Sequence, residues 1–262
     1  MFKEIGYSLA LILSTAKRKT FESLGRCIGV SGDTMGRMVT KKVATITELI
    51  ELAKEFFGNK KVYLLIDDTL ILKIYSRYIE GACDHHDSGD RRSKRSLCSV
   101  TAMLTDGKTA IPIDQLIWTS KEFKKAINHK KKWELAQELI NTVKKHIAIN
   151  MVIMDGLYAV HAMITWLVKN KIKFEMRFHS NRVIEKNGMK AQIRYSSFFK
   201  LSGRRTEQTF FAYWKGIPLC FTAIRRFGPK GFFVTFQVSN YKTSAKNHMK
   251  IYGYRWNIEK FF

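Results

Sequence analysis

The stretch from Lys61 to Thr69, with the sequence KVYLLIDDT, constrains the fold of this chain more than any other. Its residues Val62 to Ile66 are all aliphatic or aromatic, without polar alternation, which is typical of a strand buried on both faces. Asp67 and Asp68 follow at once, and open α/β sheets bind their ligands at the carboxyl ends of such strands. We therefore expect Asp68 to be a metal ligand. The alternative is a polar turn that only ends a core strand.

The composition indicates a polyanionic partner. The 262 residues include 46 Lys and Arg but only 22 Asp and Glu, a net charge of +24, and 45% apolar residues suffice for a large core. Nucleic acid matches this imbalance best, with an anionic membrane surface as the rival. No apolar run approaches the length of a membrane-spanning helix, and the four cysteines show no paired spacing. The charge therefore favours nucleic-acid binding in a reducing cytoplasm.

The N-terminal region, residues 1–60, has apolar residues at helical spacing and no strand-like alternation. Within it, Phe21 to Val39 has the spacing of a helix-turn-helix. Gly25 would lie at the helix crossing, Gly29 at the turn and Ser31 at the cap of the second helix. The second helix would then present these side chains to the major groove of DNA: Asp33, Thr34, Arg37 and Lys41. A helical hairpin that only packs against the rest of the chain is the open alternative.

A group of strands is expected after the first one. Gly81 to Arg95 is polar and rich in turn formers, so we expect an exposed loop. Its His and Cys residues resemble a metal cluster only superficially, because adjacent His side chains rarely converge on one ion. Ser96 to Thr105 and Thr109 to Trp118 indicate two strands joined by a hairpin turn at Asp106-Gly107. The sequence thus predicts three antiparallel strands.

The second half of the chain mixes helix and strand signals. Lys121 to Ile147 is basic at its start and carries a helical apolar stripe toward its end. Met151 to Asn170 indicates a short buried strand that ends in Asp155-Gly156 and is followed by a helix. The remaining expected elements are a strand (Lys173–Phe178), an antiparallel β region (Arg182–Asn240) and a helix (Ala245–Phe262).

Three ordered motifs carry a resemblance to a known family. Tyr252, Arg255 and Glu259 are spaced Tyr-x2-Arg-x3-Glu, Asp68 precedes a threonine, and Asp155 precedes Gly-Leu-Tyr. In this order they resemble the motifs of the insertion-sequence DDE transposases, in the branch with a β-strand insertion and a Tyr-Arg-Glu-Lys signature. Three further residues are similar to the segment that follows the second acid in that family: Arg177, Asn181 and Arg182.

The resemblance implies a fold of the α/β class. It implies an RNase H-like catalytic domain with an antiparallel β insertion, preceded by a small helical region that resembles a helix-turn-helix. The expected boundaries are residues 1–60 for the helical DNA-binding region, 61–181 for the catalytic core, 182–240 for the β-rich insertion subdomain and 241–262 for the start of the C-terminal catalytic helix.

The resemblance also implies cut-and-paste DNA transposition, in which metal-dependent cleavage at transposon ends is followed by strand transfer. The carboxylates that would hold Mg²⁺ or Mn²⁺ are Asp68, Asp155 and Glu259. The DNA-binding side chains would be Tyr252, Arg255, Arg177, Asn181 and Arg182, with Thr34 and Arg37 in the N-terminal region. The implied partners are transposon-end DNA, target DNA and a second copy of the chain in an active homodimer. A nucleoid-associated place in the cytoplasm, away from membranes, is expected.

Two other functions stay open: a catalytically inactive DNA-binding remnant, and an RNase H-like divalent-metal nuclease that cuts without strand transfer. The lysine of the family signature would fall beyond Phe262, so we expect a C-terminally truncated copy with weak activity. Successive residues of a strand face opposite sides of its sheet. We therefore expect Asp67 to point away from the other acids, toward which Asp68 points.

Overall fold

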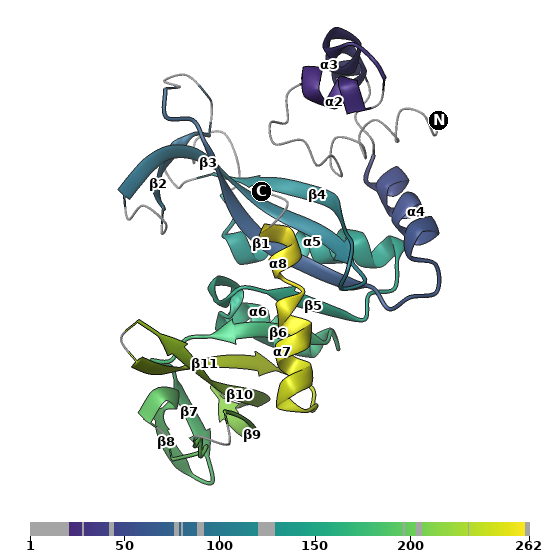
Figure 1. The fold of residues 1–262 in the computed structure, drawn as a ribbon. Helices are drawn as coiled ribbons and strands as arrows, with labels where there is room; N and C mark the ends of the chain where they lie inside the picture. Colours follow the sequence, from purple (N-terminus) through teal and green to yellow (C-terminus); the bar gives the residue numbers. More distant parts are fainter. Residues whose placement is uncertain are drawn as a thin grey trace.

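The computed structural model describes residues 21–27, 29–41, 45–75, 79, 81–87, 92–119, 129–195, 197–202, 206–229 and 231–259. Its helices are α2 (Phe21–Cys27), α3 (Gly32–Lys41), α4 (Ile46–Phe57), α5 (Lys132–His146), α6 (His161–Lys169), α7 (Ala245–Gly253) and α8 (Trp256–Glu259), with 3-10 turns η2 (Gly156–Tyr158) and η3 (Ile193–Tyr195). None of the helices in these residues is long and apolar enough to cross a membrane. Helices α4 to α8 pack on a large sheet that forms the body of the molecule, whereas α2 and α3 lie apart from it (Figure 1).

Within the described residues, eleven strands join in one sheet. They are β1 (Tyr63–Leu72), β2 (Cys83–Asp87), β3 (Arg92–Thr105), β4 (Ala110–Trp118), β5 (Met151–Met154), β6 (Phe174–Phe178), β7 (Val183–Lys186), β8 (Met189–Gln192), β9 (Glu207–Trp214), β10 (Ile217–Gly228) and β11 (Gly231–Ser239). The order is β2-β3-β1-β5-β6-β11-β10-β9-β7-β8, and β4 pairs with β3. This mixed arrangement confirms the α/β fold class.

The centre of the sheet is parallel and its flanks are antiparallel. β5 pairs in parallel with β1 on one side and with β6 on the other. The last paired residues of β1 and β5 are Ile66 and Met154, although β1 runs on to Leu72 beside β3. The sequence predicts that the strand ends at its two aspartates, and the structure corrects this, because β1 continues through both of them. Its parallel neighbour β5 ends at Met154, level with Ile66. The two carboxylates therefore follow the point at which β1 loses this neighbour in the middle of the sheet.

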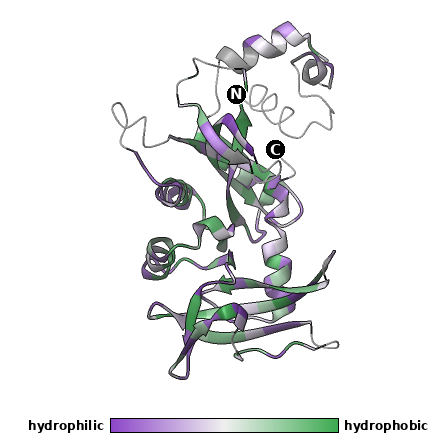
Figure 2. Cartoon of the chain, turned by 90° about the vertical axis from the view of Figure 1, so that its left-hand side faces the viewer, coloured by the Kyte–Doolittle hydropathy of each residue, from purple (hydrophilic) through white to green (hydrophobic). Residues whose placement is uncertain are grey.

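Side chains on the two faces of the sheet belong to different cores. Leu64 and Ile66 pack in the large core, which includes buried residues of α4, α5 and α6. Leu65 lies in a smaller core with Ile251 of α7 and Ile258 of α8. Figure 2, turned by 90° from the first view, shows helices on both sides of the sheet. The alternation along β1 thus sends even-numbered residues toward α5 and α6 and odd-numbered ones toward α7 and α8.

The turn at Asp106-Gly107 forms where the sequence predicts it, and two hairpins of the later β region also turn at glycine. Gly107, with a φ of 93°, lies in the turn between β3 and β4. The β7–β8 and β9–β10 hairpins turn at Asn187-Gly188 and Lys215-Gly216, and all four residues have positive φ. Two successive residues with positive φ are the requirement of a type I′ turn, whose twist matches that of the flanking strands.

Two predicted elements are corrected by the structure. Part of Gly81 to Arg95, expected to be a loop, forms β2 and the first residues of β3, and Cys83 pairs with Ser96. β2 is an edge strand, where polar and charged side chains remain in water while the backbone is paired. The C-terminal helix is not continuous, because α7 ends at Gly253 and α8 begins at Trp256. Tyr252, Arg255 and Glu259 therefore do not share one helix.

The α2–α3 hairpin has the local geometry that its sequence predicts. Gly29 lies in the turn with a φ of 73°, and the backbone N–H of Thr34 donates to Oγ of Ser31 at 3.1 Å. A Cβ at Gly25 would lie 2.5 Å from the carbonyl oxygen of Val30, so only glycine allows this close approach.

A buried polar network ties α7 to the sheet. Glu175 of β6 and His248 of α7 are fully buried, and Nδ1 of His248 lies 2.6 Å from Oε2 of Glu175. The hydroxyl of Tyr241 donates to the same oxygen at 2.8 Å. Burial raises the pKa of Glu175, while His248 and Tyr241 act in the opposite direction. The carboxylate of Glu175 therefore depends on these two partners for its place in the interior.

Tyr241→Phe tests this network. Loss of a hydrogen bond to a buried charged group should lower the free energy of unfolding by about 1.5–3 kcal/mol. Tyr195→Phe is the matched control, because Tyr195 is 73% exposed and its change should cost less than about 0.5 kcal/mol. Urea denaturation of both variants measures the difference. Equal midpoints for the two variants would contradict the structural role of the network.

Candidate active site

The candidate active site lies where β1 and β5 stop pairing. Asp67 and Asp155 each follow the last paired residues, Ile66 and Met154. Neighbouring strands are about 4.8 Å apart, so the two acids start from adjacent backbone positions. Asp155 lies directly before the 3-10 turn η2, which turns the chain away from the sheet. The topology alone thus brings together two acids that are far apart in the sequence.

Arg255 joins the first of these acids to the C-terminal segment. Its Nη1 lies 2.6 Å from Oδ2 of Asp67, and its Nη2 lies 2.5 Å from Oε1 of Glu259. The side chains of Arg255 and Asp67 are 12% and 13% exposed, so this is a largely buried ion pair. Nε of Arg255 is buried and has no hydrogen-bond partner in the described part of the chain. One guanidinium therefore holds two carboxylates from β1 and α8.

Tyr252 links the remaining acid to the same segment. Its hydroxyl donates to Oδ1 of Asp155 at 3.3 Å. Burial raises the pKa of Tyr252, and the nearby charge of Asp155 raises it further, although Arg255 and Arg177 oppose the shift. The phenol therefore stays protonated and can act as a donor. Together, Tyr252 and Arg255 hold the α7–α8 segment, which carries Glu259, against Asp155 and Asp67.

The contacts of Asp67 and Asp68 are the reverse of those expected from the sequence. Asp67 faces α7 and α8, whereas Asp68 accepts a hydrogen bond from Nζ of Lys132 at 2.6 Å. Lys132 begins α5, which covers the other face of the sheet. The physical reason is the alternation along β1, in which Leu64 and Ile66 point toward α5 and so does Asp68. Asp155 and Glu259 are brought together with Asp67.

The acids on the α7–α8 side are crowded. The pKa of Asp67 is raised to about 6, mainly by burial and also by the charges of Asp68 and Asp155, although Arg255 acts in the opposite direction. Beneath them lies Tyr158, whose pKa is raised by burial and by the same acids. The hydroxyl of Tyr158 is buried without a hydrogen-bond partner in the described residues. The site therefore concentrates negative charge that one arginine only partly offsets.

The donor set suits a hard divalent cation. Carboxylate oxygens are the ligands that Mg²⁺ and Mn²⁺ prefer, and like-charge crowding such as that on Asp67 is what a bound cation relieves. As the side chains stand, no three His, Cys, Asp or Glu among the described residues are arranged to hold a metal ion. Arg255 takes the place between Asp67 and Glu259. The chemistry of the ligands fits a metal, and the guanidinium supplies the positive charge in this state.

The three basic or polar residues expected after the second acid take different places. Arg177 is exposed at the end of β6, close enough to Tyr252 for its charge to affect that phenol. Asn181 is exposed in the following turn. Arg182 packs on the rings of Phe178 and Trp214, 5.0 Å from each centroid, and donates to the carbonyl oxygen of Ala159. Arg177 therefore acts on the phenol that binds Asp155.

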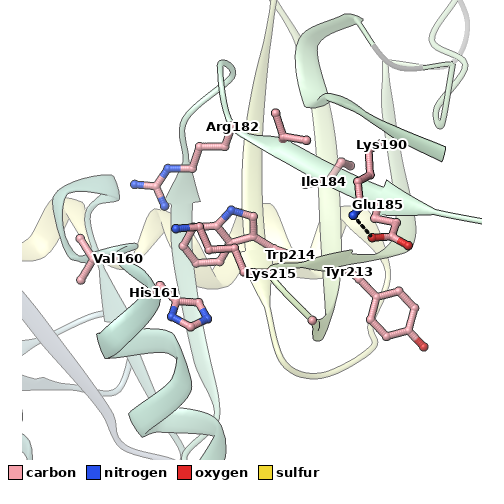
Figure 3. Close-up of a pocket in the computed structure, with 11 residues that line it drawn as sticks. Val160, His161, Arg182, Ile184, Glu185, Lys190, Tyr213, Trp214 and Lys215 are labelled. Carbon is pink, nitrogen blue, oxygen red and sulfur yellow. Dashed lines mark ion pairs between the residues drawn. The ribbon is translucent and has the colours of Figure 1, made fainter. Parts of the chain in front are cut away.

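Arg182 also lines an open cavity of about 820 Å³ between α6 and the later strands. Figure 3 shows its guanidinium beside Trp214, with His161 and Lys215 around the same ring. His161 contacts Trp214 edge to face, and Nζ of Lys215 lies 5.8 Å from the centre of that ring. The cavity is thus cationic and aromatic, and it opens near the segment that follows Asp155.

Thr34 and Arg37 lie in the first turns of α3, away from the acids. Oγ1 of Thr34 lies 2.8 Å from Oγ of Ser31, so this hydroxyl takes part in the cap of α3. Arg37 is exposed and forms a long ion pair with Asp33 at 3.9 Å. Both side chains are accessible from one end of a short helix.

Sequence reasoning missed Lys132 as a partner of the site. It lies in a run of lysines, HKKKW, that looks like any solvated basic segment. Only the start of α5 against β1 singles it out, since its Nζ binds Asp68 and lies 5.5 Å from the ring of Trp118. No spacing in the sequence distinguishes this lysine from its neighbours.

Comparison with known proteins identifies the family. A search of curated proteins finds no match. A family model described as the transposase DDE domain matches residues 82–262, well over half of the chain. The matched range contains Asp155, Tyr252, Arg255 and Glu259, and it begins after β1. The mixed sheet described above is consistent with the RNase H-like fold expected from the sequence. The chain belongs to the family of insertion-sequence DDE transposases.

Proposed function

We propose that this transposase cleaves DNA at transposon ends and transfers the cut strand to target DNA, with Asp67, Asp155 and Glu259 as its three catalytic acids. The observation that supports it most is the pair of contacts made by Arg255, which hold Asp67 and Glu259 at one place. Tyr252, from the same segment as Arg255, donates a hydrogen bond to Asp155, the third acid. Three carboxylates from β1, β5 and α8 thus meet at one edge of the parallel strands, where open α/β sheets bind their ligands.

Asp67 replaces Asp68 in this proposal because of its neighbours. Asp68 is bound to Lys132, and its side chain lies on the face covered by α5. A carboxylate on that face points away from Asp155 and Glu259, so it is a poor candidate for a metal site shared with them. Asp67 faces the other two acids, and burial, with a smaller effect of the neighbouring carboxylates, raises its pKa to about 6.

The residues that would hold Mg²⁺ or Mn²⁺ are Asp67, Asp155 and Glu259. Bound there, the metal would supply activation of a water or a 3′-hydroxyl and stabilisation of the leaving oxygen in an in-line displacement at phosphorus. Arg255 and Tyr252 are placed to bind the phosphate that is cut, since a guanidinium and a phenol both donate to phosphate oxygens. Lys132 keeps the charge of Asp68 neutralised on the far face of β1.

The finer organisation belongs to the same proposal. Residues 1–60 form the DNA-binding region, 61–181 the catalytic core, 182–240 the β-rich insertion and 241–262 the segment with the last acid. Thr34 and Arg37 contact DNA from α3 in the manner of a helix-turn-helix, and Arg177, Asn181 and Arg182 contact DNA beside the acids. The chain acts as a homodimer on nucleoid DNA in the cytoplasm. It represents the branch with the Tyr-Arg-Glu-Lys signature.

Exchanging each aspartate of β1 for asparagine tests the assignment. Asp67→Asn should lower the single-turnover rate of Mg²⁺-dependent cleavage by more than about a hundredfold, because residues that only support metal ligands already change activity by about 10–100-fold. Asp68→Asn is the matched control. The cleavage rate of this variant should stay within about tenfold of the unaltered rate. Because Lys132 loses its carboxylate partner, the free energy of unfolding should fall by about 1–3 kcal/mol. The substrate is a labelled duplex carrying the DNA that flanks the reading frame.

The same assay separates the alternatives. Joined products in the presence of a target plasmid support strand transfer, whereas cleavage without joining would favour a nuclease. Binding without cleavage at any Mg²⁺ or Mn²⁺ concentration would favour an inactive remnant. A fast Asp67→Asn variant together with a slow Asp68→Asn variant would restore the assignment expected from the sequence alone.

The affinity for duplex DNA should depend steeply on salt. Each phosphate neutralised by Lys or Arg adds about 0.9 to the log–log slope, so six to ten contacts would weaken binding by about 10³–10⁵ between 50 and 200 mM salt. Fluorescence anisotropy with a labelled duplex over that range measures the slope. Binding that hardly changes with salt would remove the basis for linking the net charge of +24 to DNA.

A further inference from the structure

The end of the β10–β11 hairpin extends beyond the rest of the sheet. β11 pairs with β6 only up to the pair of Phe236 with Phe178, and β10 pairs with β9 only up to the pair of Ile224 with Glu207. From Arg225 to the turn and back to Val234, the two strands pair with each other and with no other described strand. The hairpin end, defined here as residues 225–229 and 231–234, is thus a two-stranded ribbon (Figure 1). Its base is anchored by Val234, which packs against the large core, and by the backbone N–H of Arg225, which donates to the carbonyl oxygen of Thr206 at 2.7 Å.

Large aromatic side chains are exposed on this ribbon. Phe227, Phe232 and Phe233 are 76%, 58% and 49% exposed. Phe227 and Phe232 are directly opposite each other, with ring centres 4.3 Å apart. The guanidinium of Arg225 lies 3.7 Å from the ring of Phe232. Exposed aromatic groups of this kind mark a surface that meets a partner.

The second face of the ribbon repeats the combination. Arg226 is opposite Phe233, and both are exposed. A Cβ at Gly228 would lie 2.9 Å from the ring of Phe233, so glycine is required for this ring to pack beside the turn. Gly231 has a φ of 100°, which also favours glycine. Glycine at position 228 therefore lets the ring of Phe233 lie beside the strand end.

The register places the ribbon at the edge of the sheet that carries the acids. Met154 of β5 is paired with Met176 of β6, so Asp155 is level with Arg177, whose partner on β11 is Gln237. Phe232 is five residues further toward the turn and two strand spacings to the side. At about 3.3 Å per residue and 4.8 Å per strand, it lies roughly 20 Å from Asp155.

Charge selects the partner of the ribbon. Arg225 and Arg226 flank the phenylalanines, and the whole chain carries +24, so a polyanion is attracted to the ribbon. A two-stranded β-ribbon fits a groove of duplex DNA. Proteins that deform DNA combine Arg contacts with apolar wedges, often Phe, between base steps. The ribbon has both components at one end.

We propose that the end of the β10–β11 hairpin is a wedge that bends DNA, with Phe227 and Phe232 inserted between base steps. Arg225 and Arg226 bind the flanking phosphates. At 3.4 Å per base pair, the distance from Asp155 puts the wedge roughly six base pairs from the phosphate that is cut. This inference rests on the proposed function in one respect, namely that the chain binds duplex DNA. Unstacking at the wedge would turn the duplex toward the acids.

The double variant Phe227→Ala with Phe232→Ala in the full chain tests the wedge. A duplex labelled at both ends reports the bend by energy transfer at saturating protein. The unaltered protein should bend it by about 20–90°, the range that inserted wedges produce, and the variant should lose most of that bend. Its dissociation constant should change less than tenfold, because phosphate contacts carry most of the affinity.

Two further variants are matched controls. Phe211→Ala removes a similarly exposed phenylalanine, 48%, from β9 in the same sheet and should leave the bend unchanged. Arg225→Ala with Arg226→Ala should reduce the salt slope by about 2 and weaken binding, while the DNA that is bound remains bent. A fluorescent adenine analogue scanned along the duplex should brighten at one step near the expected spacing.

Each outcome bears on one of the two proposals. An unbent duplex with the unaltered protein bound would overturn the wedge and leave the transposase function standing. A bend that survives in the Phe227 and Phe232 variant would also overturn it. Variants that change the sedimenting mass of the protein but not the bend would assign the ribbon to a protein contact instead. Failure of the unaltered chain to bind duplex DNA would contradict the proposed function itself.

Discussion

The ionic contact between Arg255 and Asp67 is the interaction on which the site depends. It joins a residue of the central strand to one 188 positions later, at a distance of 2.6 Å and largely out of water. The same guanidinium holds Glu259, so a single side chain decides where two acids lie. Removal of one partner from a buried pair leaves a charge without compensation, which is costly. The break between α7 and α8 at Tyr254 and Arg255 lets this side chain reach the strand.

Adjacent aspartates on β1 serve opposite faces of the sheet. Asp67 belongs to the crowded acids, while Asp68 is bound by Lys132 beneath the strand. Each therefore has its own cation, which keeps two neighbouring negative charges tolerable in a partly buried position. A divalent cation at the acids would act on one side of the sheet only. The proposed chemistry at Asp67 and the ion pair of Asp68 with Lys132 thus lie on opposite faces of the same strand.

Local patterns in the sequence predicted the strands and most hairpin turns, because these depend on neighbouring residues alone. The apolar run before Asp67, the Asp106-Gly107 turn and the spacing of Tyr252, Arg255 and Glu259 are all of this kind. Which aspartate faces the acids could not be predicted, since strand alternation has no phase until a helix covers one face. β2 and Lys132 were hidden for a similar reason. An edge strand and a lysine at a helix start carry no local signal that sets them apart.

The order of elements in the chain has a consequence for folding. The acids come from β1, β5 and α8, and the pairing of Asp67 with Arg255 closes a loop of 188 residues. Contacts between residues so far apart in the sequence form slowly, because the chain loses entropy on loop closure before the contact stabilises it. The strands of the sheet can pair before α7 and α8 dock, since their register does not involve those helices. The candidate site is therefore among the last parts to assemble, and partly folded chains carry the full positive charge before the acids have come together.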